Sequence, residues 1–309
     1  MPKPEPSIAF EETPALVLLR KSVGDATRSL NGIIVALETL RHVEPVKPDD
    51  LILSWHPSED PTDLQRTRAF AMRSAMVAVV DGVDRYLRVV TRVNGLVDED
   101  LHDYLNGRWI RALDRRPTVF ERLRYLSDWV PGAVSENLLL AFDLLATWRN
   151  EFVHYERRHP LPRTKKEALK AQATWFTENR GGADIVAMVA RYEAAEAPTI
   201  ADLVTLFAAA QRTVSEIDER LLLRKSGTEY AVALMSCLLK ENANPTAMLE
   251  RVFEHGGTSS SGTIHALFLH WGANHDERRR ANAPSLTRRE LNALLGLGRN
   301  RAKELFLLE

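Results

Sequence analysis

The sequence contains four long stretches in which apolar residues return at three-, four- or seven-residue steps. They occupy residues 14–42, 63–93, 135–160 and 198–225. Because an α-helix has about 3.6 residues per turn, each stretch is predicted to form an amphipathic helix. Their apolar faces include Leu16, Leu19, Val23, Leu30, Ile33, Leu37 and Leu40 in the first, Met76, Val80, Val83, Leu87 and Val90 in the second, and Leu203, Phe207, Val214, Ile217 and Leu221 in the fourth. The pattern predicts an all-α fold.

Shorter helices are predicted between and after these stretches, in residues 108–132, 165–176 and 183–197. Only the segment LILSW, residues 51–55, has a pattern that suits a β-strand. Ser226-Gly227 ends the fourth stretch, and we expect a domain boundary there. Residues 1–225 are then a helical bundle, and residues 226–309 are a smaller C-terminal helical domain.

The composition indicates a cytoplasmic protein without membrane contact. The first residues are polar and rich in proline, without the apolar region of a secretory signal, and no run reaches the roughly 18 apolar residues of a membrane span. The one cysteine, Cys237, cannot form an internal disulfide, which fits a reducing compartment.

Two stretches are locally basic although the formal net charge is −1. Residues 108–124 hold six arginines against Asp114 and Glu121, and residues 149–170 hold seven arginines and lysines against three glutamates. Such patches can attract a polyanion. A solvated helix face has the same composition, so the charge count alone does not separate the two interpretations.

The segment TWRNEFVHYERRHP, residues 147–160, places an arginine where the helical pattern expects an apolar residue. Arg149 falls about 20° from Phe142 on the helical wheel, within a stripe predicted to be buried. The other members of that stripe are Leu138, Leu145, Phe152 and Val153. Because an unpaired buried charge is costly, Arg149 must meet a carboxylate, a phosphate or a polar cleft between protomers.

A polar ridge runs beside this stripe, formed by Asp143, Thr147, Asn150 and His154. His154 lies near the predicted end of the helix, where the helix dipole favours imidazolium, while Arg149 and the arginines that follow favour the neutral ring. A histidine balanced in this way suits general acid–base catalysis near neutral pH. Glu151 points away from the ridge, as expected of a solvated ion-pair partner.

The hexapeptide Arg149-Asn150-Glu151-Phe152-Val153-His154 resembles the R-x(4–6)-H signature of HEPN-domain ribonucleases, in its R-N-x-x-V-H form. The segment RSAMVAVVDGVDRYLRVV, residues 73–90, resembles an earlier core helix of that family, with Asp84 as the first candidate for its acidic residue and Asp81 as the second. The resemblance extends over residues 14–225, but its specific part is the hexapeptide.

The resemblance implies a HEPN-like helical bundle that acts as a homodimer, with one composite active site at the dimer interface. It implies a metal-independent endoribonuclease, a toxin or antiphage-defence effector that cleaves RNA, often tRNA, by attack of the 2′-OH and leaves a 2′,3′-cyclic phosphate. Arg149, Asn150 and His154 would be catalytic, supported by Asp84, and Arg157 and Arg158 would contact RNA. No cofactor or metal is expected. An antitoxin or another defence-system component is expected as a partner.

The tail LNALLGLGRNRAKELF, residues 291–306, admits three interpretations. It resembles a helix-hairpin-helix, in which Gly296, Gly298, Arg299 and Arg301 would contact nucleic acid and Ala302 fits the pattern. It also resembles a helix-turn-helix, in which Thr287 and Glu290 open the first helix and residues 300–307 form the recognition helix. The third interpretation is a helical pair packed on the body through Leu291, Leu294, Leu297 and Leu305.

The alternative function is a non-catalytic, HEPN-like binding or regulatory module that contacts nucleic acid or a partner protein through this C-terminal segment. In that case the motif around Arg149 is an ion-paired helix end. His265, His270 and His275 recur at five-residue steps, about 140° apart on a helix, so they do not share a face and predict no metal site.

Overall fold

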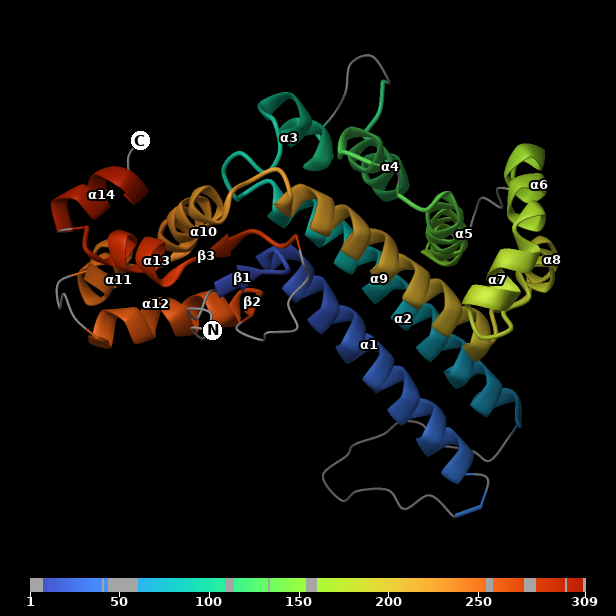
Figure 1. Cartoon of the computed structure of the whole chain (residues 1–309). Helices are drawn as coiled ribbons and strands as arrows, with labels where there is room; N and C mark the ends of the chain where they lie inside the picture. Colours follow the sequence, from blue (N-terminus) through green and yellow to red (C-terminus); the bar gives the residue numbers. More distant parts are fainter. Residues whose placement is uncertain are drawn as a thin grey trace, which may run out of the picture. The chain divides into compact units, whose positions relative to one another are not determined.

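The computed structural model of the chain describes residues 8–40, 42–43, 61–108, 114–132, 134–153, 160–253, 258–274, 282–297 and 299–307. Fourteen helices and three very short strands occur among them, so the predicted all-α fold is confirmed (Figure 1). The strand expected at residues 51–55 lies outside the described residues. No helix in the described ranges is long and apolar enough to cross a membrane.

The chain divides into two compact units. Unit 1 comprises Met1–Leu19, Asp84–Val134 and Val214–Glu309, and unit 2 comprises Arg20–Val83 and Ser135–Thr213. The division falls within three long helices, which contribute to both units: α1 (Pro14–Thr39), α2 (Pro61–Val90) and α9 (Ile200–Leu222). The boundary predicted near residue 226 is instead the start of helix α10, inside unit 1, where Ser226 and Glu229 form a capping box.

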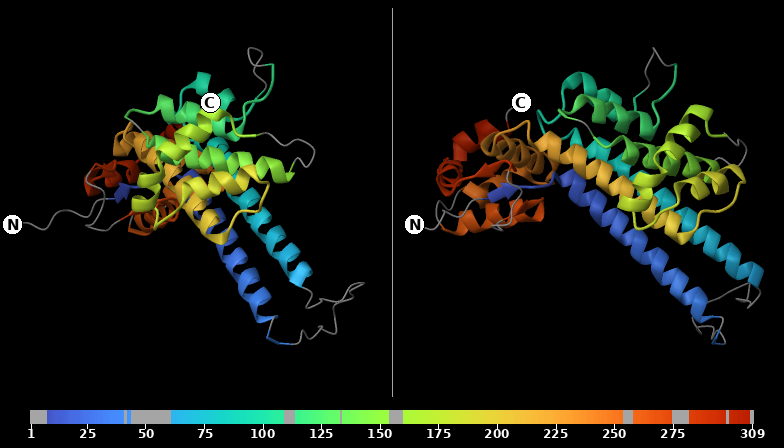
Figure 2. Two further views of the ribbon diagram at one scale, coloured as in Figure 1. Left: turned by 90° about the vertical axis from the view of Figure 1, so that its right-hand side faces the viewer. Right: turned by 45° about the vertical axis from the view of Figure 1, so that its right-hand side comes forward.

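Unit 2 is completed by four further helices. They are α5 (Glu136–Val153), α6 (Arg163–Ala171), α7 (Ala173–Asn179) and α8 (Ile185–Glu193). Helix α6 packs against α5, α7 and α8, and these helices gather together in both views of Figure 2. The interior of this group is formed by large side chains such as Trp148 on α5, whose ring meets Tyr192 of α8 edge to face at 5.8 Å.

Unit 1 contains the remaining helices and all three strands. They are β1 (Ile8–Phe10), α3 (Glu99–Leu105), α4 (Val119–Trp129), α10 (Gly227–Glu241), α11 (Pro245–Phe253), α12 (Thr258–His270), β2 (Ala273–Asn274), β3 (Ser285–Leu286), α13 (Arg288–Leu295) and α14 (Arg299–Leu307). The strands form an antiparallel sheet in the order β2-β1-β3, in which Ala9 lies opposite both Asn274 and Ser285. This sheet was not predicted.

Close backbone approaches fix the sheet. Gly272 has φ +98°, and a Cβ there would lie 2.3 Å from the backbone oxygen of Glu12. At the other side, a Cβ on Gly227 would lie 2.0 Å from the backbone oxygen of Ser285, so α10 begins directly against β3. Both positions therefore require glycine.

The predicted apolar faces are buried in two helices and only in part in the third. All five residues chosen on α2 and all five on α9 are buried. On α1 the face is buried from Leu16 to Leu30, but Ile33 is 40% exposed and Leu37 and Leu40 are half-buried. The second half of α1 thus has less packed against it than its apolar pattern predicts.

Candidate functional site

Helices α2 and α5 meet in unit 2 through two side-chain contacts, which define the candidate site. Arg149 Nη2 on α5 donates to Asp81 Oδ1 on α2 at 2.8 Å. Nearby, the guanidinium of Arg73 on α2 lies over the ring of Phe152 on α5, 4.8 Å from its centroid.

Arg149 lies at the edge of the buried stripe. Its side chain is 20% exposed, and its Nη1 donates to Asn150 Oδ1 at 3.2 Å. Its Nε is buried and has no hydrogen-bond partner. The predicted need for a compensating group is met by Asp81, a carboxylate that is itself 58% exposed. The guanidinium is therefore held in one orientation beside water.

The acidic partner of Arg149 is Asp81, which the sequence ranked second to Asp84. Asp84 lies three residues further along α2, about 60° around the helix. Its carboxylate is paired with Arg122 of α4 and with Arg88 one turn along α2. Asp84 is thus engaged in a different cluster, and the carboxylate that pairs with Arg149 is Asp81. The catalytic role expected of Asp84 stays a prediction.

Of the predicted catalytic and RNA-binding residues on this segment, the structure describes Arg149 and Asn150. Helix α5 ends at Val153, and His154, Arg157 and Arg158 lie outside the described residues. Asn150 is exposed, as its place on the polar ridge predicts. The ridge is shorter than predicted because Asp143 is buried, where Lys165 Nζ of α6 lies 2.5 Å from its Oδ2.

Two residues of the hexapeptide differ from expectation. Val153, predicted in the buried stripe, is 45% exposed at the end of α5. Glu151, predicted to be a solvated ion-pair partner, is half-buried, and its Oε1 has no hydrogen-bond partner. It lines a cavity of about 220 Å³ together with Pro160, Tyr192 and Glu193. This cavity holds two carboxylates, one of which, Glu193, is paired with Lys166.

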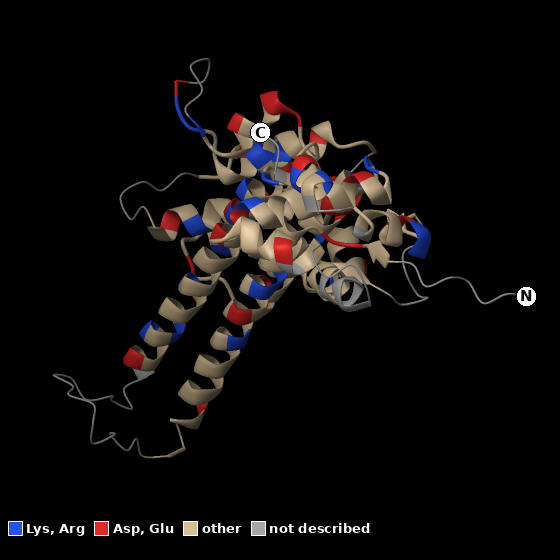
Figure 3. Cartoon of the chain, turned by 90° about the vertical axis from the view of Figure 1, so that its left-hand side faces the viewer, with Lys and Arg blue, Asp and Glu red and all other residues tan. Residues whose placement is uncertain are grey.

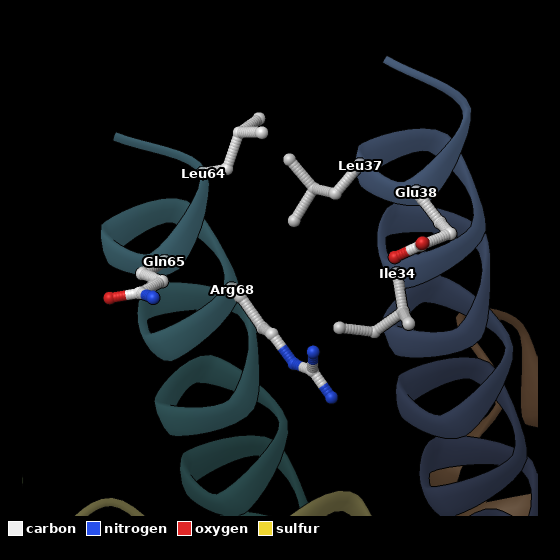
Figure 4. A pocket seen from close by; sticks show the side chains of 6 residues that line it. All are labelled: Ile34, Leu37, Glu38, Leu64, Gln65 and Arg68. Carbon is white, nitrogen blue, oxygen red and sulfur yellow. The ribbon is translucent and has the colours of Figure 1, made fainter. Parts of the chain in front are cut away.

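A second hollow of unit 2 lies between α1 and α2, away from the motif. Figure 4 shows Leu37 of α1 and Leu64 of α2 directed toward one another across it, with the Arg68 guanidinium below them. It is lined by Ile34, Leu37, Glu38, Leu64, Gln65 and Arg68. The hollow belongs to the exposed second half of α1.

The arginine-rich stretch 108–124 is largely ion-paired within unit 1. Its pairs are Arg108 with Asp103, Arg115 with Glu121, Arg122 with Asp84, and Arg124 with Asp128. The view in Figure 3 likewise shows basic and acidic residues interspersed along the helices. The count of arginines therefore overstates the positive charge that this stretch presents to a polyanion.

The C-terminal segment forms two helices, and Thr287 and Glu290 make the predicted capping box of α13. The Gly296 amide donates to Asn292 O at 2.8 Å and the Leu297 amide to Leu294 O at 3.3 Å, so these donors close α13. Helix α14 packs on α10 and α11 through the buried Ala302 and Phe306, while Leu305 is 45% exposed. These contacts match the packed-pair interpretation. Of the leucines predicted to pack, Leu291 is buried and Leu294 and Leu297 are half-buried.

The structure describes only some of the other residues that were predicted to contact nucleic acid in this segment. Arg301 is exposed on α14, and Arg299 begins that helix with its side chain outside the description. Gly298 lies outside the described residues. Gly296 has φ −74°, a value open to any residue, so the backbone there does not require glycine.

Sequence reasoning missed a buried polar cluster in unit 1. Asp218 of α9 is fully buried and accepts hydrogen bonds from the Thr13 amide at 2.9 Å, the Thr13 hydroxyl at 2.5 Å and the Tyr86 hydroxyl at 3.1 Å. Burial raises the pKa of Asp218 to about 6, although these hydrogen bonds oppose the shift. The cluster has no opening to solvent, and we interpret it as structural.

Arg73 was also missed, although a signal for it exists. It interrupts the apolar pattern of α2 as Arg149 interrupts that of α5, and it lies eight residues before Asp81, about 80° away around the helix. No group of three or more histidine, cysteine, aspartate or glutamate side chains is placed to hold a metal ion in the part of the chain that is described. Comparison with protein-family models, curated proteins and solved structures finds no match to this chain.

Proposed function

We propose that this protein is a metal-independent endoribonuclease with Arg149, Asn150 and His154 as its active centre. The observation that carries the proposal is the arrangement of Arg149, whose guanidinium is fixed between Asp81 and Asn150 at the exposed edge of α5. In the sequence, His154 follows Arg149 by five positions. A forked donor for phosphate oxygens and an imidazole for proton transfer are the two groups that cleavage of RNA by its own 2′-OH needs.

The proposed reaction forms one bond and breaks one. The 2′-oxygen of the ribose attacks the adjacent phosphorus, its proton goes to a base, and the 5′-oxygen leaves with a proton from an acid. The products are a 2′,3′-cyclic phosphate and a 5′-hydroxyl. His154 serves as base or acid, and the histidine of a second copy supplies the other function. Arg149 donates to the non-bridging oxygens, where negative charge grows in the transition state.

Asp81 and Asn150 act as positioning residues in this proposal. The Asp81 carboxylate accepts from Nη2 and Asn150 accepts from Nη1, which limits rotation of the guanidinium. A donor that is oriented before the substrate arrives stabilises the transition state without reorganisation at the moment of reaction. On binding, the phosphate competes with Asp81 for the same donors.

The biological role that we propose is a toxin or antiphage-defence effector acting as a homodimer in the cytoplasm. RNA, with tRNA as one candidate, is the substrate, and an antitoxin or another component of the defence system restrains the enzyme. The role rests on the resemblance of the hexapeptide to the HEPN family.

The test is cleavage of total RNA by the purified protein in the presence of EDTA. Wild type should produce fragments that end in a 2′,3′-cyclic phosphate, and His154→Ala should not. A matched control is Asn179→Ala, a change of another helix-end polar residue of unit 2, which should cleave as wild type does. RNA left intact by wild type, or cleaved equally by His154→Ala, would count against the proposal.

A second candidate function is a non-catalytic module that binds nucleic acid or a partner protein. It is favoured by the same ion pair, because an Arg149 fully engaged by Asp81 also serves as an ordinary helix-end contact. Expression in cells separates the two candidates. The nuclease should arrest growth and His154→Ala should not, whereas the binding module should be neutral in both forms.

A further inference from the structure

The ion pair of Arg149 and Asp81 leaves the candidate site with little net charge to attract a phosphate. Arg149 brings one positive charge and Asp81 one negative charge, 2.8 Å apart. Attraction of a polyanion depends on cations that are not already compensated. A site that binds RNA on this helix pair therefore needs a further cation near Arg149.

Arg73 is a cation on the same pair of helices. It lies on the face of α2 that meets α5, half-buried, with its guanidinium over Phe152. Its Nε is buried without a hydrogen-bond partner, as is that of Arg149, and no ion pair of Arg73 is found among the described residues. Phe152 and Arg149 are three residues apart, about one turn of α5, so the two guanidinium contacts fall within one turn of that helix.

The geometry points to a two-phosphate binding site in which Arg149 holds the scissile phosphate and Arg73 holds a neighbouring phosphate of the same RNA strand. This inference rests on the proposed function and assigns Arg73, which touches no reacting atom, to substrate binding. The Arg73 guanidinium lies over the Phe152 ring in a cation–π contact, and its terminal nitrogens are the donors that we assign to phosphate oxygens.

The experiment measures binding separately from cleavage. The full-length chain carrying His154→Ala is titrated against a fluorescein-labelled single-stranded oligouridylate, and Kd is followed by anisotropy between 50 and about 300 mM salt. Adding Arg73→Ala should raise Kd about 10-fold and make the slope of log K against log salt shallower by about 0.7, the value for one phosphate contact with a single strand. Arg66→Ala removes an exposed arginine from the same helix and should leave both quantities unchanged.

A conservative variant guards against loss of structure. Arg73→Lys keeps the charge but cannot lie flat on Phe152 or donate through a fork, so the salt slope should stay while Kd rises by a few fold. Circular dichroism and thermal melting of each variant report folding. If Arg73→Ala fails to fold, Arg73→Lys and Phe152→Leu serve as the test. Both should weaken RNA binding without changing the slope of log K against log salt.

The outcomes separate this inference from the proposed function. Wild type that binds oligouridylate with an Arg73-dependent slope but never cleaves RNA supports the inference and overturns the nuclease. Wild type that cleaves RNA, with Arg73→Ala binding like Arg66→Ala, overturns the inference and leaves the nuclease standing. A chain that neither binds nor cleaves RNA overturns both.

Discussion

Helix α2 carries two aspartates three residues apart, and each pairs with an arginine from another helix in a different way. Arg122 of α4 is almost fully buried, and besides Asp84 it donates to Leu105 O at 2.9 Å and to Thr118 O at 3.4 Å. Arg149 of α5 is 20% exposed, pairs with the largely exposed Asp81 and keeps one nitrogen without a partner. One arginine has its donors used within the protein, and the other does not.

The difference separates an arginine that holds the fold from one that is available to a ligand. A buried guanidinium needs acceptors for its donors, because each unmet donor costs free energy. In the cluster around Arg122, each of the three guanidinium nitrogens has an acceptor within the protein. In the cluster around Arg149 the partner carboxylate is exposed to solvent, so a phosphate can replace Asp81. The following predictions test this division.

The largest expected effect is on stability, at the buried pair. Arg122→Ala should lower the free energy of unfolding by about 3–5 kcal/mol, because the Asp84 carboxylate and two backbone oxygens lose their partner. Urea denaturation followed by circular dichroism measures it. Arg85→Ala, at an exposed position of α2, is the control and should change stability by about 0.5 kcal/mol or less. Equal losses of stability in Arg122→Ala and Arg85→Ala would contradict a structural role for Arg122.

Arg149→Ala should affect activity and leave stability almost unchanged. RNA cleavage should fall by about 10²–10³-fold, the usual cost of removing a transition-state donor, while the free energy of unfolding changes by about 1 kcal/mol or less. Single-turnover cleavage and urea denaturation of the same preparation measure both quantities. A large loss of stability with intact cleavage would mean that Arg149, like Arg122, stabilises the fold and does not act in cleavage.

Asp218 is a buried carboxylate whose hydrogen-bond donors are the neutral groups of Thr13 and Tyr86. Burial raises the pKa of Asp218 to about 6, above the 3.8 of an unfolded chain, so the folded state binds more protons between these values. The stability that Asp218 contributes by this linkage is complete below about pH 3.8 and is lost as the pH rises through 6.

Replacing this carboxylate by an amide should remove the pH dependence. Relative to wild type, Asp218→Asn should gain unfolding free energy on the order of 2–3 kcal/mol as the pH rises from 4 to 7. Urea titrations at several pH values measure it, and Asp202→Asn is a comparison at an aspartate that has a cation, Arg191. A constant difference across that range would show that Asp218 titrates normally.

The smallest effect is expected at Asp81. Asp81→Asn should change the free energy of unfolding by about 1 kcal/mol or less, because the pair is exposed to solvent. If Asp81 orients Arg149, kcat should fall while KM stays near the wild-type value, and Asp81→Glu should restore part of the rate. Unchanged kcat in Asp81→Asn would mean that Asn150 alone positions the guanidinium.

Much of the fold could be predicted because its information is local. The stripes of α2 and α9 repeat with the helical period, and capping boxes mark the starts of α10 and α13. The sheet could not be predicted in this way. Its strands are two or three residues long, too short to show alternation, and β1 pairs with segments from the other end of the chain.

The candidate site, like the fold, could be predicted only as far as local sequence patterns determine it. The helical wheel placed Arg149 where a charge needs a partner, and α2 supplies that partner. The choice between Asp81 and Asp84 depends on the direction in which α2 faces α5 and α4, which is tertiary information. Arg73 was missed because a single arginine in an apolar helix is ordinary until Phe152 is seen beneath it.

The central position of β1 has a consequence for synthesis of the chain on the ribosome. Residues 8–10 are synthesised before both of their neighbours in the sheet, β2 and β3, at residues 273–274 and 285–286. The edges of β1 therefore stay unpaired until those residues have been made, a state that favours aggregation. A fragment beginning at residue 226 would lack the strand that joins β2 to β3, so the helices after residue 226 depend on residues 8–10 for this sheet.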